Sequence, residues 1–452
     1  MVFVGKGIFM RLFRLGQQLS PFQIIMLSFL LLIAIGTIAL MLPVATRSGQ
    51  GAPFLTALFT TVSAACVTGL TLENTALYWS WFGQLVILLL IQVGGLGVVT
   101  MAVAIVMASG RRIDLMQRST MQEALAAPQL GGIVRILRFI LKFTVLVECL
   151  GACVLFPVFL RDYGVENGLW MAFFHSISAF CNAGFDLMGN RGGGSLMSYA
   201  GDPLVNLTIM GLIVAGGLGF ITWADIQLNR QYFSRYRLQT KIILLMTAGL
   251  ILVPALLFFF LEFQDFPEEI RVFQALFQSV TARTAGFNTV DINLLSESGR
   301  LLLIVLMLVG GAPGSTAGGI KSTTAFVLLT SALASLRRKR DVTFFSRRIA
   351  EETNQQALTI FLMYLMLFVG SSWLISVVDG FGMLDCMVET ASAIGTVGLS
   401  FGLTERLSAF SQVLLILLMY FGRVGALTMI YALNKRSIPV TGRMPQEKIT
   451  VG

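Results

Sequence analysis

The chain reads Ser63-Ala64-Ala65-Cys66-Val67-Thr68-Gly69 at the end of a moderately apolar stretch of about a dozen residues. The same design, a turn of small residues that ends in glycine, returns three times, as Ser178-Ala179-Phe180-Cys181-Asn182-Ala183-Gly184, Thr281-Ala282-Arg283-Thr284-Ala285-Gly286 and Ser392-Ala393-Ile394-Gly395-Thr396-Val397-Gly398. The final glycines are 115, 102 and 112 residues apart. Because each preceding stretch is too short to cross a bilayer as a helix, the four turns are expected at membrane depth. They predict one site built from four pseudo-equivalent quarters, the geometry of an ion-selective pore.

The composition is that of an integral membrane protein. Hydrophobic residues make up 56% of the chain, charged residues 12%, and the mean hydropathy is +0.82. A soluble protein carries roughly twice that charged fraction. The apolar runs have helical length and do not alternate with polar residues, which excludes an outer-membrane barrel. The net charge of +9 comes from clusters at the ends of apolar runs, so membrane topology explains it and no nucleic-acid partner is expected.

The apolar runs group into four pairs of membrane spans. These are Phe22–Leu42 with Phe82–Met107, Ile133–Leu160 with Leu204–Ala224, Ile242–Leu261 with Leu301–Leu336, and Ala357–Val378 with Val413–Leu433. A short half-membrane segment lies within each pair: Phe54–Ala65, Leu169–Phe180, Val272–Ala282 and Leu384–Ile394. This repetition predicts an all-α polytopic membrane protein with four pseudo-symmetric helix–pore-helix–helix repeats around one central pore. The repeats are expected over residues 20–110, 111–238, 239–340 and 341–434, followed by a cytoplasmic tail over 435–452.

The distribution of basic residues predicts the orientation in the membrane. Of the 32 lysines and arginines, 23 lie before the first span, between repeats or after the last span, and seven lie between the two spans of a repeat. The positive-inside rule then places both termini in the cytoplasm of a multi-pass protein of the cytoplasmic membrane. The four turns fall in the outer half of the bilayer.

The turns have the properties of a filter for a monovalent cation. A half-helix that enters from outside points its negative dipole end and unpaired carbonyls at the membrane centre, and carbonyls can replace the hydration shell of an ion. The turns contain no Asp or Glu, which argues against a divalent cation. The predicted ligands are the backbone carbonyls of Cys66, Val67, Thr68, Gly69, Cys181, Asn182, Ala183, Gly184, Arg283, Thr284, Ala285, Gly286, Gly395, Thr396, Val397 and Gly398. The alternative is that small residues only pack the spans together.

Arg283 is unexpected in a cation filter. It stands where the first repeat has Cys66, and the third repeat is one residue shorter before its turn. We expect the guanidinium to face away from the pore and to pair with an acid such as Asp291 or Glu389.

The second span of the third repeat is interrupted. Its break contains one proline and five glycines within ten residues, which cannot hold a stable helix; the residues are Gly310, Gly311, Ala312, Pro313, Gly314, Ser315, Thr316, Ala317, Gly318 and Gly319. The second span of the fourth repeat, Val413–Leu433, is predicted to be continuous. A break in one repeat only predicts a mobile segment below the pore, with a static kink as the alternative.

Two basic residues accompany this break. Arg423 lies in the middle of an apolar run, where an unpaired arginine costs about 2.5–3.5 kcal/mol. We expect it to face the pore under the filter, to donate hydrogen bonds to carbonyls of the broken segment and to raise a barrier to cations. Lys321, at the restart of the broken span, is its weaker companion. The other reading of Arg423 is a structural residue without a part in permeation.

The cysteines and the single histidine point to no metal or cofactor site in this chain. Because all five cysteines lie in apolar segments or turns without metal-ligand spacing, they are expected to be buried thiols; they are Cys66, Cys149, Cys153, Cys181 and Cys386. His175 is the only histidine, which excludes histidine-rich metal sites.

The chain resembles the superfamily of potassium transporters that comprises the Trk, Ktr and plant HKT proteins. The resemblance rests on the four turns, on Gly-Gly-Ala-Pro-Gly-Ser-Thr-Ala-Gly-Gly-Ile-Lys at 310–321 and on Phe-Gly-Arg-Val-Gly at 421–425. The ending from Pro445 to Gly452 is similar to that of the bacterial Ktr membrane subunits, which are the best match. The resemblance implies K⁺ as the permeant ion, with Na⁺ as a possible second ion, and Gly69 matches a filter glycine associated with K⁺ preference.

The resemblance also implies partners and a gate. Relatives are homodimers with one pore per protomer, and a cytoplasmic ring of RCK-domain subunits controls them. A nucleotide such as ATP or ADP would therefore act only through that partner, since this chain has no nucleotide-binding motif. The broken segment and the arginine at position 423 match the gate of the family.

The residues allow three functions to be distinguished. The first is a K⁺ uptake pore, passive or weakly coupled to Na⁺. The second is a tightly coupled Na⁺ or H⁺ symporter with alternating access, for which Glu148 is the main candidate among few acids in the spans. Four-fold repetition favours the pore. An intramembrane enzyme is not expected, because the spans hold no catalytic constellation.

Overall fold

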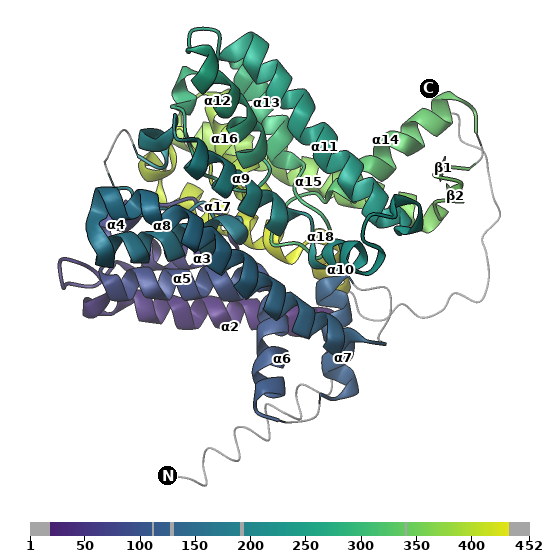
Figure 1. The fold of residues 1–452 in the computed structure, drawn as a ribbon, viewed down its shortest axis with the longest axis horizontal. Coiled ribbons are helices and arrows are strands. Elements are labelled where there is room, and N and C mark those ends of the chain that lie inside the picture. Colours follow the sequence, from purple (N-terminus) through teal and green to yellow (C-terminus); the bar gives the residue numbers. More distant parts are fainter. Residues whose placement is uncertain (1–18, 111–112, 127–130, 190–193, 340, 434–452) are drawn as a thin grey trace.

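The computed structural model describes residues 19–110, 113–126, 131–189, 194–339 and 341–433. The tail predicted over 435–452 and the basic residues before the first span lie outside these ranges. The regular secondary structure of the described chain is helical except for one small hairpin, β1 (Thr343–Phe344) paired antiparallel with β2 (Arg347–Arg348). Helices α6 and α7 project from one corner of the molecule, and α14 with the hairpin projects from another (Figure 1).

Candidate membrane spans account for most of the helices. Within the described ranges four helical segments are long and apolar enough to cross a bilayer: α2 (Pro21–Met41), α8 (Ile133–Phe180), α11 (Leu238–Leu257) with its extension η5 (Phe258–Glu262), and α15 (Glu351–Asp379). The number rises to seven when three bent pairs each count as one span. The halves α13 (Glu297–Leu308) and α14 (Ser322–Leu336) complete the predicted set of four pairs.

The predicted half-membrane segments are pore helices. They are α3 (Phe54–Ala65), the second half of α8, α12 (Glu268–Thr281) and α16 (Met383–Gly395). In the second repeat the pore helix is not separate, because α8 runs from the first span into it and bends at Gly164, whose φ of 76° is left-handed. A glycine tolerates that dihedral without steric strain, so the helix turns back into the membrane without a loop.

The second span of every repeat begins with a side-chain cap. Ser80, Ser296 and Ser408 accept hydrogen bonds from backbone N–H groups in the first turns of α5 (Trp81–Leu96), α13 and α17 (Ala409–Val424). Asp202 caps α9 (Pro203–Gly217) in the same way. These caps satisfy amides that the helix itself leaves unpaired, so each second span starts at a defined residue.

The second spans of the other three repeats are also broken, which corrects the sequence analysis. Helix α5 meets α6 (Val98–Ala108) at 95°, α9 meets α10 (Phe220–Asn229) at 93°, and α17 meets α18 (Ala426–Leu433) at 92°. Gly97, Gly219 and Gly425 stand at these bends with φ between 84° and 90°. The prediction of a continuous span over 413–433 was wrong, because one glycine in an apolar run carries no signal that distinguishes a bend from close packing.

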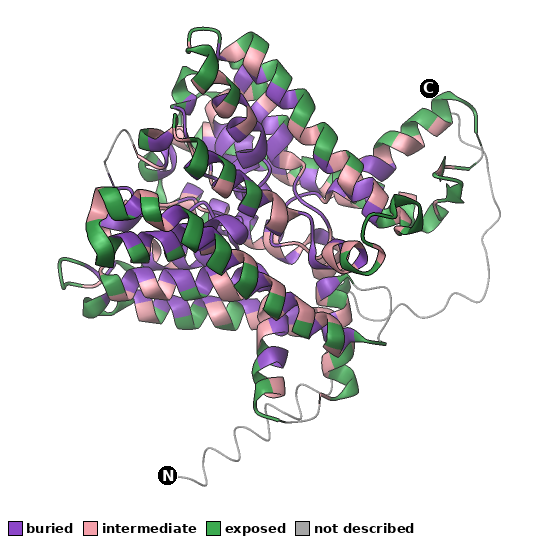
Figure 2. Ribbon diagram, viewed as in Figure 1, coloured by how far each residue is buried: buried purple, intermediate pink, exposed green. Residues whose placement is uncertain are grey.

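Burial separates the pore from the surface. Buried residues gather in the middle of the molecule, where pore helices and filter turns meet, and exposed residues cover its outside (Figure 2). Large apolar side chains such as Leu31, Ile35 and Ile38 of α2 are exposed on that outside. Such an apolar surface suits contact with lipid, and the protein is a multi-pass membrane protein.

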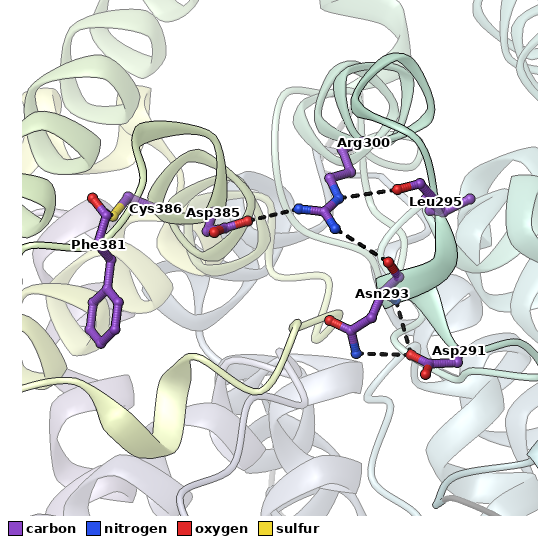
Figure 3. A network of polar contacts seen from close by, with 7 residues as sticks. All are labelled: Asp291, Asn293, Leu295, Arg300, Phe381, Asp385 and Cys386. Carbon is purple, nitrogen blue, oxygen red and sulfur yellow. Dashed lines mark hydrogen bonds and ion pairs between the residues drawn. The ribbon is translucent and has the colours of Figure 1, made fainter.

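An arginine network joins the third and fourth repeats near the start of their helices. Arg300 of α13 pairs through Nη1 with Asp385 Oδ1 at 3.1 Å and donates to the carbonyls of Leu295 and Asn293, each at 3.2 Å (Figure 3). Its guanidinium also lies 4.7 Å from the ring centroid of Phe401. Asp385 lies in the first turn of α16, where its charge also favours the positive end of the helix dipole.

We expect Arg300→Ala to lower the free energy of unfolding by about 1–3 kcal/mol, because it removes the ion pair, two carbonyl contacts and the ring contact together. Asp385→Asn removes only a partly exposed ion pair and should cost about 1 kcal/mol or less. Thermal unfolding of the purified protein in detergent measures both. The control is Arg161→Ala, since Arg161 is 73% exposed beside Asp162. An equal effect of Arg161→Ala and Arg300→Ala would contradict the assignment.

Candidate ion-binding site

The four filter turns, residues 66–69, 181–184, 283–286 and 395–398, share one backbone conformation. The second residue of every turn is left-handed although none is a glycine, with φ of 57° at Val67, 58° at Asn182, 68° at Thr284 and 52° at Thr396. The glycine that ends each turn also has positive φ, at 93°, 70°, 81° and 95° for Gly69, Gly184, Gly286 and Gly398. Four non-glycine residues in an uncommon region at equivalent positions mark a shared, defined geometry.

The turns also close into a ring. A Cβ built on each glycine would collide with the carbonyl oxygen of the third residue in another turn. The distances are 2.4 Å from Gly69 to Ala183 O, 2.7 Å from Gly184 to Ala285 O, 2.4 Å from Gly286 to Val397 O, and 2.3 Å from Gly398 to Thr68 O. Each repeat therefore contacts the next, and the fourth contacts the first. The four turns surround one axis.

A hydroxyl group behind each turn supports its shape. Ser63 and Ser392 accept from the N–H of Gly69 and Gly398, each at 3.0 Å. In the other two repeats the hydroxyl donates instead, to the carbonyl of the phenylalanine that follows the glycine. Ser178 Oγ lies 2.7 Å from Phe185 O, and Thr281 Oγ1 lies 2.7 Å from Phe287 O. The sequence difference after the glycines, phenylalanine in two repeats and leucine in two, thus accompanies a difference in hydrogen bonding.

Glu389 supports the fourth turn from behind. Its side chain lies in α16, fully buried, and its carboxylate accepts hydrogen bonds from the hydroxyls of Ser400 and Thr404, with Thr404 Oγ1 2.6 Å from Oε2. This contact ties the pore helix to the segment that leaves the filter. The sequence analysis named Glu389 only as a partner for Arg283, and the serine and threonine that bind it carry no sequence signal of their own.

Neither of the acids predicted as partners of Arg283 binds it. Asp291 accepts from Asn293, Glu389 is bound as described, and none of the ion pairs in the described residues includes Arg283. Its side chain is only 7% exposed and its Nε has no partner in the described chain. It borders a cavity of about 10 Å³ together with Asn182 and Gly311. That is about the size of one water molecule.

The interrupted span of the third repeat forms a packed loop over residues 310–319, here called the intramembrane loop. Val309 and Ile320, which flank the loop, form a parallel β-bridge that brings its two ends together. Its backbone is held by helix α9 and the start of α10: Ala312 N donates to Gly217 O at 2.9 Å, and Phe220 N donates to Gly314 O at 3.0 Å. The loop therefore takes a defined path, with α9 beside it.

Arg423 reaches the intramembrane loop from the fourth repeat. Its Nη1 donates to Thr316 O in the loop. Its Nη2 donates to Gly94 O and, at 2.8 Å, to Gly95 O at the end of α5. Three carbonyls thus compensate the desolvated charge, and one guanidinium connects the first, third and fourth repeats. The contact with the loop agrees with the expectation, whereas the contact with α5 had no sequence signal.

A cavity adjoins these contacts. Its volume is about 290 Å³, and its lining includes Arg423, Lys321 and the loop residues Pro313, Gly314, Ser315, Ala317 and Gly319. Lys321 precedes α14 and donates through Nζ to Ala317 O at 2.7 Å. The end of α7 (Leu115–Leu125) also borders the cavity, a contribution that no sequence motif indicated.

The thiols divide into two groups. Cys66, Cys181 and Cys386 are buried, as expected, and Cys66 and Cys181 occupy the first position of their filter turns. Cys149 and Cys153 are exposed along α8, so the expectation that all five are buried was wrong. Both lie on the side of a first span that faces away from the pore, where an apolar run offers exposure to lipid as readily as burial.

We expect Glu389→Ala to lower the free energy of unfolding by about 1–3 kcal/mol, since it removes the carboxylate that accepts from the hydroxyls of Ser400 and the buried Thr404. Glu389→Gln keeps one acceptor oxygen and should cost less. Thermal unfolding in detergent measures the order of the two variants. Glu166→Ala is the matched control, because Glu166 is exposed and its loss should leave stability unchanged. Equal stability of Glu389→Ala and wild type would refute the bracing role.

Comparison with known proteins agrees with this architecture. The chain is 37% identical over 452 residues to the potassium/sodium uptake protein NtpJ of Enterococcus hirae, covering 97% of this chain and 99% of that protein. It is 38% identical over 425 residues to the Ktr system potassium uptake protein B of Bacillus subtilis, covering 92% and 94%. The crystal structure of the potassium transporter TrkH from Vibrio parahaemolyticus shares the fold, with a TM-score of 0.70 at 19% identity over 91% of this chain and 84% of that one.

The family model of cation transport proteins named for TrkH matches residues 17–439. Together with the identity to Ktr proteins, this match covers all four filter turns, the intramembrane loop and Arg423. The chain therefore belongs to the TrkH/Ktr family of cation transport proteins.

Proposed function

We propose that this protein takes up K⁺ across the cytoplasmic membrane, through a filter made of backbone carbonyls. The closed ring of glycines and carbonyls carries the proposal, because it places four equivalent oxygen-bearing turns around one axis. Carbonyl oxygens without carboxylates suit a monovalent cation. The names of two relatives, a potassium/sodium uptake protein and a Ktr system potassium uptake protein, support K⁺ as the ion. The protein acts as a transporter and not as an enzyme.

The intramembrane loop and Arg423 form the gate in this proposal. The loop contacts the filter on one side and lines the cavity on the other. Arg423 donates hydrogen bonds both to Thr316 O of the loop and to Gly94 O and Gly95 O of α5, so it links the loop to α5. A positive charge in the permeation path also opposes cations. Loss of these contacts would free the loop and remove the charge, so opening requires that Arg423 release at least one of its carbonyl partners.

Regulation is proposed to come from outside this chain. The Ktr system naming of relatives supports a separate regulatory subunit, an RCK-domain ring that binds a nucleotide on the cytoplasmic side of a homodimer. The positive-inside distribution, with 23 of 32 basic residues in the connections between repeats and at the ends, supports cytoplasmic termini. Na⁺ dependence is part of the same proposal, and the name of the Enterococcus hirae relative, a potassium/sodium uptake protein, supports Na⁺ as a second ion.

A tightly coupled symporter remains the second candidate, and one observation favours it. Glu148 of α8 is 6% exposed, accepts from Gln92 at 3.2 Å, and has a second carboxyl oxygen without a partner in the described chain. A buried carboxyl group of this kind can carry a coupling proton. It lies behind the filter, however, and the four-fold ring needs no alternating access. In proteoliposomes, K⁺ flux that continues when neither a Na⁺ gradient nor a H⁺ gradient is imposed would decide for the pore, because a tightly coupled symporter needs one of them.

We expect Gly69→Ser to reduce the preference for K⁺ over Na⁺ by about tenfold or more, because a Cβ would lie 2.4 Å from Ala183 O and must displace a filter carbonyl. Growth of a K⁺-uptake-deficient strain at low K⁺, with tracer flux of both ions, measures the preference. Gly249→Ala is the control, since a Cβ there meets nothing within 4 Å. An unchanged ion preference in a well-expressed Gly69→Ser variant would end the filter assignment.

We expect Arg423→Gln, or deletion of residues within 310–319, to raise K⁺ flux several-fold, because each removes the contact that holds the loop below the filter. The measurement is flux into proteoliposomes without the regulatory subunit, normalised to reconstituted protein. Arg337→Gln is the control, as Arg337 is exposed at the end of α14. Unchanged or lower flux in both gate variants would overturn the gate.

A further inference from the structure

Asn182 stands out among the second residues of the filter turns. The equivalent residues are Val67, Thr284 and Thr396, so only the second repeat carries an amide at this level. The Asn182 side chain is 1% exposed. Its Nδ2 donates to Thr284 Oγ1 in the next filter turn at 3.3 Å, and its Oδ1 accepts from Thr316 Oγ1 in the intramembrane loop at 3.4 Å. One side chain of the second filter turn thus contacts the third filter turn and the loop.

Thr316 makes the matching connection from the loop. Its hydroxyl is within reach of both Asn182 Oδ1 and Phe180 O, the latter at 3.1 Å and immediately before the second filter turn. Its carbonyl accepts from Arg423. A line of hydrogen bonds therefore runs from Arg423 through Thr316 and Asn182 to Thr284.

The loop, the filter and α9 approach one another closely around this line. A Cβ on Gly216 of α9 would lie 2.7 Å from Thr316 Oγ1 and 3.0 Å from Asn182 Oδ1. On the opposite side, a Cβ on Gly318 of the loop would lie 2.1 Å from Thr396 Oγ1. Thr396 Oγ1 has no hydrogen-bond partner among the described residues, so that contact is only steric. Asn182 provides the polar link that connects loop position to filter shape.

We infer that Asn182 is a positioning residue that couples the intramembrane loop to the inner end of the filter. The inference rests on the proposed gate and deepens it. When the loop moves away, Thr316 leaves and Asn182 Oδ1 loses its donor in a buried site. An unpaired buried amide oxygen is costly, so the side chain reorients and releases Thr284. Loop displacement then changes the second and third filter turns, and ion preference depends on whether the gate is closed or open.

The test is a double-mutant cycle with Asn182→Thr and Thr316→Val. Threonine already stands at this left-handed position in the third and fourth repeats, so Asn182→Thr keeps a tolerated backbone and removes the amide. Thr316→Val keeps the shape and removes the hydroxyl. Full-length variants are reconstituted in proteoliposomes without the regulatory subunit, and K⁺ flux is measured together with the K⁺/Na⁺ flux ratio.

Each single variant should raise basal K⁺ flux about two- to tenfold, the change that one hydrogen bond makes in an equilibrium. Each should also lower the K⁺/Na⁺ ratio, and the double variant should exceed neither single variant, because all three break the same link. Thr316→Ser keeps the hydroxyl donor, so its K⁺ flux should stay below that of Thr316→Val. Thr359→Val is the matched control: it makes the same substitution as Thr316→Val at an exposed residue of α15, away from the filter and the loop, and should leave flux unchanged.

Additive effects of the two substitutions, or a lower K⁺/Na⁺ ratio with unchanged basal flux, would overturn the coupling. If Arg423→Gln raises flux while Asn182→Thr and Thr316→Val do not, the gate stands and the inference fails. If Arg423→Gln also leaves flux unchanged, the gate itself fails and the inference with it. Should Asn182→Thr not fold, as judged by its melting temperature, Asn182→Ser replaces it in the cycle.

Discussion

The architecture depends on the close approach of each filter glycine to a carbonyl of the neighbouring turn. A side chain at any of these four positions would meet an oxygen at 2.3–2.7 Å, well inside van der Waals contact. The approach is possible only where four turns are held by four pore helices and by the hydroxyls of Ser63, Ser178, Thr281 and Ser392. Those helices can lie inside a membrane because outer spans cover them. The repeats, the central burial and the caps of the second spans together position the four turns of this ring.

Much of this could be read from the sequence, because the relevant signals are local. Helix α3 spans Phe54–Ala65 as predicted, since an apolar stretch that ends at a small-residue turn defines both of its ends. The interruption at residues 310–319 was equally clear, as its glycines and proline exclude a helix. The bends at Gly97, Gly219 and Gly425 were not predicted, because each depends on one dihedral that only the surrounding packing determines.

Buried charges show the same limit. The contact of Arg423 with the loop followed from the cost of an unpaired charge at membrane depth, but its carbonyl partners on α5 depend on a tertiary approach of the first and fourth repeats. For Arg283 the same argument led to two acids, and both are bound elsewhere. An energetic need for a partner does not identify the partner, since backbone carbonyls and water satisfy a guanidinium as well as a carboxylate does.

Differences between the repeats make the surroundings of the four filter turns unequal. All four second spans bend, so a bend alone cannot make the third repeat special. What distinguishes that repeat is the length of its break: residues 309–321 between α13 and α14 lie outside any helix, and this segment is long enough to contact both the filter turns and α9. Because of it, residues at equivalent positions of the four turns have different neighbours. Asn182 is hydrogen-bonded to Thr284 of the next turn and to Thr316 of the loop. Thr396 packs against Gly318 of the loop. Val67 has no polar side-chain group. Repetition builds the ring of turns, and the longer non-helical segment of one repeat, which contacts α9 and Arg423, makes the surroundings of those turns unequal.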